Sequence, residues 1–254
     1  MTRKIARYGW IPDLPDQRDH LFAAQPDTLT KLPPSVDLRP GCPEVYDQGQ
    51  LGSCTGNAIA AAIQFDEMKQ NETNPAPPSR LFIYFNERSI EGTIQSDAGA
   101  QIRDGIKSVN QTGYCREDLW PYDIAQFAAK PPQPAYDDAA GHKAVQYQRL
   151  SHDLQQMKGS LAEGYPFVFG FTVYESFEGP EVAKSGNCPM PGSTEKSIGG
   201  HAVLAVGYDD ANQWFWVRNS WGSDWGQGGY FTLPYAYIAQ RNLSSDFWNI
   251  RLVA

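Results

Sequence analysis

Helical periodicity and strand alternation occupy different parts of this chain, and this separation limits the folds available to it. Apolar residues recur at helical spacing from residue 53 to about residue 69, and a second helical stretch covers about residues 100–109. The last third carries three runs with the alternation or the aromatic and β-branched composition of strands, at 165–174, 202–208 and 214–219. We therefore expect helices before strands, with a crossing between two lobes at the proline-rich residues 130–134.

The first 31 residues differ from both regions. Pro12, Pro15 and Pro26 interrupt this segment, and no hydrophobic periodicity in it is longer than one turn. We therefore predict an extended N-terminal arm over residues 1–31.

Length, composition and charge exclude several classes of protein. With 254 residues, 41% of them hydrophobic, the chain can bury a core without disulfide bridges. Its net charge of −8 argues against nucleic acid as a partner. No apolar stretch approaches the roughly 20 residues that span a bilayer, and the N-terminus lacks the apolar core of a signal peptide. We expect no membrane partner, and the compartment stays open.

The four cysteines are more typical of chemistry than of a structural framework. Cys42, Cys54, Cys115 and Cys188 lack the paired short spacings of a zinc site, so we expect no bound metal. Cys54 stands in the first turn of the predicted helix, where the helix dipole and the unpaired amides favour a thiolate. Gln48 and the Cys54 N–H could together stabilise an oxyanion. The alternative is a buried structural cysteine.

A predicted hairpin brings a histidine and an asparagine together. The last two strand runs flank a turn centred on Asp210, so that residues whose numbers sum to 420 lie opposite one another. His201 then faces Asn219. With Cys54, these residues supply a nucleophile, a base and a group that orients the base. A core histidine is the alternative for His201, and Trp221 would shield the His–Asn contact from water.

Six short motifs follow one another along the chain. They are residues 48–54 (Gln-Gly-Gln-Leu-Gly-Ser-Cys), 120–122 (Trp-Pro-Tyr), 200–203 (Gly-His-Ala-Val), 206–208 (Val-Gly-Tyr), 218–222 (Arg-Asn-Ser-Trp-Gly) and 225–230 (Trp-Gly-Gln-Gly-Gly-Tyr). In this order they resemble the papain-like cysteine peptidases. Residues 32–39 are similar to that family's mature N-terminus, and residues 12–19 and 52–57 are most similar to its bacterial, xylellain-type branch.

The resemblance implies an α+β, papain-like fold with two lobes and an active site in the cleft between them. A peptidase domain over residues 32–254 would follow the arm. Its helical lobe would cover about residues 44–130. A β-rich lobe, antiparallel and barrel-like, would cover about residues 131–240, with a C-terminal strand or tail to residue 254.

The resemblance also implies a mechanism. The Cys54 thiolate, paired with the His201 imidazolium, would attack the peptide carbonyl, while Gln48 and the Cys54 amide hold the oxyanion. His201, oriented by Asn219, would then protonate the leaving amine. We expect a peptide or protein substrate, endopeptidase action, no cofactor and a monomer. An acyltransferase or amidase with the same triad and a non-catalytic binding homologue are the alternatives.

Substrate binding is expected along a backbone edge and in one side-chain pocket. The residues implied by the resemblance are Gly99, Ala100, Gln101, Ile102, Gly170, Gly200 and Trp221. Ser245 or Asp246 would close the floor of the pocket, and an acidic floor at Asp246 would favour basic substrate side chains.

Two residues depart from the family pattern. Leu51 stands where the better-known members have a disulfide cysteine, and Thr55 stands where they have tryptophan. The usual set of disulfides is therefore absent, and Cys42, Cys115 and Cys188 can form at most one bridge.

The arm is too short for the helical pro-segment of eukaryotic members, and two positions are open for it. It could lie over or beside the cleft as an inhibitory, zymogen-type segment docked by Tyr8, Trp10, Ile11 and Phe22. Alternatively, it packs on the back face of the lobes.

Overall fold

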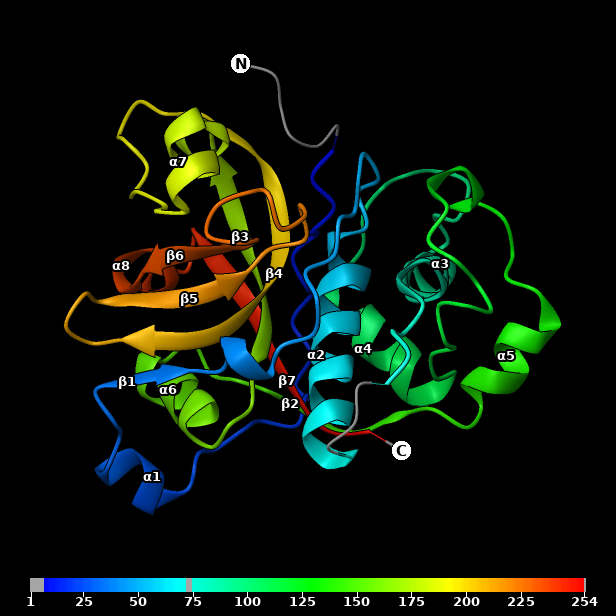
Figure 1. Ribbon diagram of the computed structural model, residues 1–254, viewed down its shortest axis with the longest axis horizontal. Coiled ribbons are helices and arrows are strands. Elements are labelled where there is room, and N and C mark those ends of the chain that lie inside the picture. The colour runs from blue at the N-terminus through cyan, green and yellow to red at the C-terminus, as the bar shows by residue number, and fades with distance from the viewer. Residues whose placement is uncertain (1–6, 72–74, 254) are drawn as a thin grey trace.

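A computed structural model describes residues 7–71 and 75–253 and shows two lobes side by side (Figure 1). The helices of the first lobe are α2 (Cys54–Asn71), α3 (Arg80–Glu91), α4 (Ile102–Gln111), the single-turn η2 (Ile124–Gln126) and α5 (Gln133–Ala139). The second lobe is built on a sheet whose strands are β1 (Ser35–Asp37), β2 (Ala144–Arg149), β3 (Phe167–Tyr174), β4 (Ser197–Asp209), β5 (Trp214–Arg218), β6 (Tyr230–Pro234) and β7 (Ser244–Val253). Its short helices and turns are α6 (Leu154–Ala162), η3 (Glu175–Glu178), α7 (Pro180–Ser185) and α8 (Tyr235–Ala239). The arm carries α1 (Pro26–Thr30), and η1 (Arg39–Gly41) follows β1.

The strands form an antiparallel sheet in the order β2-β7-β3-β4-β5-β6, and β1 pairs with β4. The α+β class is confirmed. The sheet is nevertheless open, because β2 pairs with β7 alone and β6 with β5 alone among the strands of the described chain. The expected barrel-like closure is therefore wrong for the described residues.

The crossing between the lobes lies about ten residues later than expected. α5 follows the proline run and packs on the helical lobe, where Tyr136 and Phe82 have ring centroids 4.9 Å apart. The helical lobe therefore extends past residue 130. At the C-terminus, β7 is an inner strand between β2 and β3, and its buried Phe247, Trp248 and Ile250 belong to the core.

α2 lies along the junction of the two lobes (Figure 1). Residues 54–66 of this helix are all buried, and the helix shares a hydrophobic cluster with apolar residues of β4. A helix that is enclosed on all sides needs apolar or small residues around its whole circumference, and the run Ala58–Ile63 supplies them. This packing fixes the first turn of α2, and thus Cys54, at the lobe junction.

The β4–β5 hairpin has a different register from the predicted one. The residue numbers of paired partners add up to 423 next to the turn and to 422 beyond a bulge between Ala205 and Gly207. The predicted sum was 420. The turn is longer than predicted and ends at Gln213, which adopts a left-handed φ of 57°. Continued past β5, this register places Trp221 at the level of His201, since 201 + 221 = 422.

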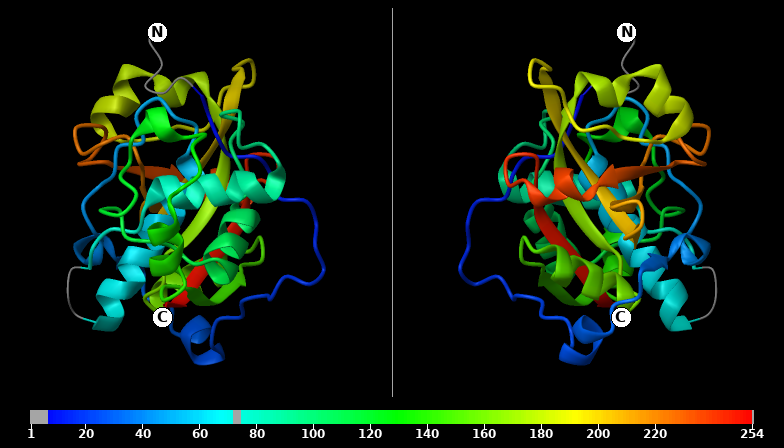
Figure 2. Two further views of the ribbon diagram at one scale, coloured as in Figure 1. Left: turned by 90° about the vertical axis from the view of Figure 1, so that its right-hand side faces the viewer. Right: turned by 90° about the vertical axis from the view of Figure 1, so that its left-hand side faces the viewer.

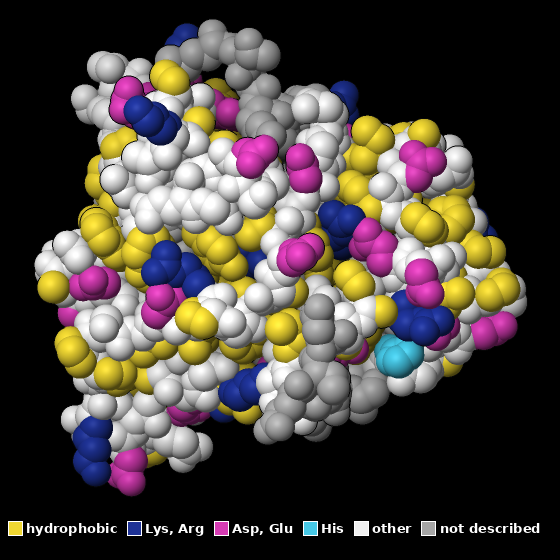
Figure 3. All heavy atoms as spheres, in the orientation of Figure 1, with side chains coloured by type: hydrophobic (Ala, Val, Ile, Leu, Met, Phe, Trp, Pro, Cys, Tyr) yellow, Lys and Arg dark blue, Asp and Glu magenta, His cyan; other side chains and the backbone are white. Residues whose placement is uncertain are grey.

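All four cysteines carry free thiols, so the one bridge that the sequence allows is not formed. Within residues 7–71 and 75–253, no helix has both the length and the apolar composition required to cross a membrane. Acidic and basic side chains are interspersed over the face of the molecule in Figure 3.

Candidate active site

Cys54 begins α2 at the lobe junction and is fully buried. The preceding turn is held by Gly52, whose N–H donates to the Asp97 carboxylate at 3.0 Å, and by Asn57, whose N–H donates to the Ser53 carbonyl at 3.0 Å. The sulfur accepts the N–H of Ala202 at 3.4 Å. Because Ala202 follows His201 on β4, the strand that carries the predicted base contacts the predicted nucleophile across the lobe junction.

His201 and Asn219 meet through their side chains as predicted, although not as directly opposed residues. His201 Nε2 and Asn219 Oδ1 are 2.8 Å apart, and the indole of Trp221 stacks on the imidazole at a centroid distance of 5.1 Å. Asn219 Oδ1 also accepts the N–H of Ser220 at 2.8 Å, which fixes the carboxamide. His201 Nδ1 has no hydrogen-bond partner among the described residues, so this nitrogen remains available for a thiol.

Gln48 is tied to the segment that carries Asn219. Its N–H donates to the Ser220 carbonyl at 2.9 Å, and its Oε1 accepts the Ser220 hydroxyl at 2.6 Å. Its Nε2 donates to the Leu51 carbonyl at 2.9 Å, which uses one of the two amide hydrogens. The hydroxyl of Tyr122, from the Trp-Pro-Tyr motif, donates to the Gln48 carbonyl at 2.9 Å. Gln48 is thus held rigidly beside Cys54.

The departures at Leu51 and Thr55 are accommodated without disulfides. Leu51 packs in a small cluster with Tyr84 and Ala100. Thr55 donates its hydroxyl at 2.5 Å to Glu87, a fully buried carboxyl that sequence reasoning missed. Burial raises the pKa of Glu87 well above its ordinary value.

The arm runs through the lobe junction (Figure 1), where Cys54 and His201 are both fully buried. Its Trp10 N–H donates to the Gly200 carbonyl at 2.9 Å. The Ala100 N–H donates to the Gly9 carbonyl at 2.8 Å, and the Ile11 N–H donates to the Ala100 carbonyl at 3.0 Å. The arm therefore pairs with the expected substrate edge as a parallel strand.

Gly9 lies directly at the thiol. Its N–H hydrogen-bonds to Cys54, and a Cβ added at Gly9 would come within 1.7 Å of the Gly52 carbonyl oxygen. A Cβ at Gly99 would come within 2.3 Å of the Gly9 carbonyl oxygen. Only glycines allow this close approach of two backbones.

Trp10 fills the expected side-chain pocket. Its ring lies against Gly170 and Gly200, where an added Cβ would meet ring atoms at 1.9 Å and 2.6 Å. Its Nε1 donates to Asp246 Oδ2 at 3.1 Å, so Asp246 closes the pocket floor, and Ile102 belongs to the same hydrophobic cluster as Trp10. The neighbouring Ser245 pairs with Gly170 across β3 and β7. Gln101 lies further along the arm, where its Oε1 accepts the Leu14 N–H at 3.0 Å.

Tyr8 lies on the opposite side of Gly9 from Trp10. Its ring meets the His201 imidazole edge-on at 6.0 Å and is tilted against the Trp221 indole at 6.4 Å. Its hydroxyl donates to the Glu178 carboxylate.

The arm lies first in the lobe junction, which is one of the two positions left open by the sequence, and then along the β-rich lobe. Tyr8 and Trp10 dock in the lobe junction, while Ile11 docks mainly through its backbone because its side chain is 37% exposed. The arm then loops out from the body (Figure 2). Phe22 returns to the β-rich lobe, where its N–H donates to the Arg149 carbonyl at 2.8 Å.

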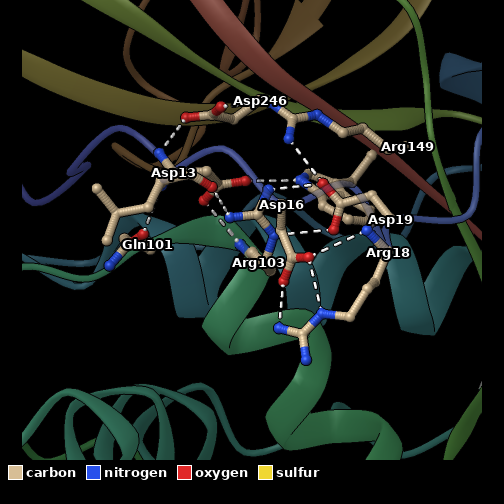
Figure 4. A network of polar contacts seen from close by, with 10 residues as sticks. Asp13, Asp16, Arg18, Asp19, Gln101, Arg103, Arg149 and Asp246 are labelled. Carbon is tan, nitrogen blue, oxygen red and sulfur yellow. Dashed lines mark hydrogen bonds and ion pairs between the residues drawn. The ribbon is translucent and has the colours of Figure 1, made fainter.

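A buried network of charged residues, which sequence reasoning missed, fastens the arm between these contacts (Figure 4). The Asp19 carboxylate bridges Arg103 of α4 and Arg149 of β2 at 2.6 Å and 2.7 Å. Arg149 also pairs with Asp246 at 3.2 Å, and Asp246 accepts the N–H of Asp13 at 2.8 Å. The sequence signal for this network is the density of acidic residues between 13 and 19.

Burial under the arm changes the protonation of the site. It raises the pKa of the Cys54 thiol to about 12 and lowers the pKa of His201 to about 4, the latter in spite of the hydrogen bond that His201 Nε2 donates to Asn219 Oδ1. At neutral pH, with the arm in place, both side chains are therefore uncharged.

Residues 32–246 match the family model described as papain family cysteine protease. The crystal structure of xylellain, a cysteine protease from Xylella fastidiosa, has a TM-score of 0.92 and 44% sequence identity, covering 100% of this chain and 99% of that one. An uncharacterized peptidase C1-like protein from Acanthamoeba polyphaga mimivirus is 45% identical over 99% of this chain and 89% of its own length. A cathepsin B-like protein, CP3, from Giardia intestinalis is 31% identical over 81% of this chain and 70% of its own length. The first two similarities include the arm.

Proposed function

This chain belongs to the papain family of cysteine proteases, as its motifs indicated, and is a cysteine peptidase; on that premise we propose that Cys54 is the nucleophile and that the N-terminal arm keeps it latent. The substrate is a peptide or protein. Peptide hydrolysis then requires the arm to leave the lobe junction.

The proposed reaction uses four side chains. They are those of Cys54, His201, Asn219 and Gln48. When the arm leaves, the proton of the Cys54 thiol passes to His201 Nδ1, and the imidazolium and the thiolate stabilise each other. The thiolate forms a bond to the substrate carbonyl carbon, and the oxyanion accepts the second Nε2 hydrogen of Gln48 and the N–H of Cys54. His201 returns its proton to the leaving nitrogen as the peptide bond breaks, and Asn219 holds the imidazole in place. Water then releases the acyl group from the sulfur.

The observation that carries this proposal is the path of the arm. Its backbone bonds to Ala100 and Gly200 and its Trp10 ring on Gly170 use the groups expected to bind substrate. The acyl half of a substrate is its N-terminal half, and we assign it to the pocket that Trp10 fills. Trp10 is C-terminal to Gly9, so the arm runs in the opposite direction to a substrate.

The reversed direction of the arm explains why Cys54 does not cleave it. Cys54 faces the N–H of Gly9, and the Gly9 carbonyl is engaged by the Ala100 N–H. The group that the arm presents to the thiol is thus an N–H donor, whereas attack requires that a carbonyl carbon face the sulfur. The arm therefore inhibits without being cut at Gly9.

We propose that the pocket on Gly170 accepts large side chains and that Asp246 presents a hydrogen-bond acceptor at its floor. The Trp10 indole supports the size, and its bond from Nε1 to Asp246 supports the acceptor. Arg149 stays paired with Asp246 when the arm leaves, which balances the charge of the carboxylate. The preference for basic side chains expected from an acidic floor is weakened accordingly.

Titration of the thiol tests the assignment of Cys54. One equivalent of a thiol-directed epoxide per chain is expected to abolish hydrolysis of a fluorogenic peptide, with the label located on Cys54 by mass spectrometry. A Cys42→Ser variant is the matched control and should titrate like the parent. Hydrolysis that persists when Cys54 is fully labelled contradicts the assignment.

A further inference from the structure

The arm residues on either side of Gly9, Tyr8 and Trp10, occupy the places of the leaving half and the acyl half of a substrate. This assignment rests on the proposed function. The acyl half lies along Ala100 and in the Trp10 pocket. His201 protonates the leaving nitrogen, so the first residue of the leaving half lies beside the imidazole. Tyr8 occupies this place, because its ring meets both His201 and the Trp221 indole. Its seat is therefore the subsite for the residue directly after the cleaved bond.

The polar wall of this subsite is Glu178, which accepts the Tyr8 hydroxyl. Glu178 ends η3, and the turn is anchored by the buried Phe177, whose ring lies 5.4 Å from Trp221 and 5.1 Å from Phe231. The carboxylate is thus attached to a fixed backbone that packs on the wall of the site itself. A fixed acceptor at the rim of an apolar aromatic seat is suited to a long side chain that carries a donor at its end.

Two further carboxyl groups lie near Glu178. The same turn carries the exposed Glu175, and the Glu195 carboxylate accepts the N–H of Ser176. Lys196 lies on the loop before β4, and its carbonyl accepts the Glu175 N–H at 3.3 Å. The rim of the subsite therefore carries carboxyl groups besides that of Glu178.

From this geometry we propose that Glu178 determines specificity on the leaving side, favouring substrates with lysine, arginine or tyrosine directly after the scissile bond. The aliphatic stem or the ring would pack on Trp221, as Tyr8 does, and the terminal donor would bond to the carboxylate. Tyr8 of the arm thus occupies this subsite in the same way as the preferred substrate side chain would.

Two matched pairs of internally quenched peptides test the proposal on the full chain. The members of each pair differ only after the scissile bond, lysine against methionine and tyrosine against phenylalanine. An aminoacyl coumarin amide has no amino-acid residue after the scissile bond and serves as the reference substrate. A Glu178 variant also loses the bond to Tyr8, which would change the rates of all substrates by the same factor, and the reference measures that factor.

The parent is expected to cleave the lysine peptide about 5- to 10-fold better than the methionine peptide, a range typical of a partly exposed charge contact. Glu178→Gln should reduce this ratio to within twofold of unity, and Glu178→Lys should favour an aspartate peptide. Glu175→Gln, on the same turn, is the matched control and should leave the ratio unchanged. A lysine-to-methionine ratio that is the same in the parent and in both Glu178 variants overturns the proposal. Failure of the proposed function has a separate signature, since the coumarin reference would then not depend on Cys54.

Discussion

Replacement of Cys54 by alanine is expected to lower kcat/KM for a peptide substrate by at least about 10⁴-fold, the scale found when the nucleophile of a covalent hydrolase is removed. No other thiol can take its place. Cys115 is buried against Phe82, Ala135 and Ala139 in the helical lobe, and Cys188 is buried in the core of the β-rich lobe. Cys42 directly follows η1 and donates its S–H to the Leu38 carbonyl at 3.5 Å.

The loss should be chemical and not structural. Cys54 is a small side chain whose sulfur accepts backbone N–H groups, so its removal leaves a cavity of about one atom. The melting temperature of Cys54→Ala should therefore stay close to that of the parent. An unchanged melting temperature together with hydrolysis above about 1% of the parent rate would show that another group attacks the substrate.

The second large effect is expected from Trp10→Ala in the full chain. Removal of a buried tryptophan costs about 3 kcal/mol or more, which corresponds to about 10²-fold in the equilibrium between docked and released arm. The substitution also leaves Asp246 without the indole donor. We expect hydrolysis of a fluorogenic peptide to rise by up to about 10²-fold over the parent.

This variant retains the remainder of the arm and the fold. Asp19 still bridges Arg103 and Arg149, and Phe22 still packs in the β-rich lobe. Leu14→Ala is the matched control, because Leu14 lies on the same arm but its side chain is 71% exposed. Equal rates for Trp10→Ala and Leu14→Ala would mean that the arm does not limit access to the site.

The position of Cys54 could be predicted because it depends on local sequence. The glycine-containing turn before residue 54 and the apolar run after it fix a helix start without reference to the remainder of the chain. The pairing of His201 with Asn219 was predicted from a register that proved wrong by two to three residues. The two side chains still meet, because neighbours on the diagonal of an antiparallel pair are within reach of long side chains.

The path of the arm could not be predicted, because it is fixed by contacts distant in sequence. Asp19 is held by Arg103 and Arg149, and Trp10 is held by Gly170 and Asp246. Neither set has a sequence spacing that a local pattern could indicate. The open sheet has the same cause, since the place of β7 between β2 and β3 depends on pairing across more than 70 residues.

We propose that the docked arm holds Cys54 and His201 in their uncharged forms, and the pH dependence of Cys54 alkylation shows whether it does. Iodoacetamide reacts with the thiolate. The rate of alkylation is measured from pH 4 to pH 9, with the label on Cys54 quantified by mass spectrometry. With the arm docked, the pKa of Cys54 is raised to about 12 and that of His201 is lowered to about 4. The full chain should therefore react slowly, with a rate that climbs throughout this range as the thiolate fraction grows.

In Trp10→Ala the released site forms the thiolate–imidazolium pair, which lowers the pKa of Cys54 below its ordinary value. Alkylation of this variant should stay fast down to acidic pH. At pH 6 its rate should exceed that of the full chain by about 10²-fold, which is the change expected in the equilibrium between docked and released arm. Identical rates and identical pH profiles for the two proteins would contradict the account.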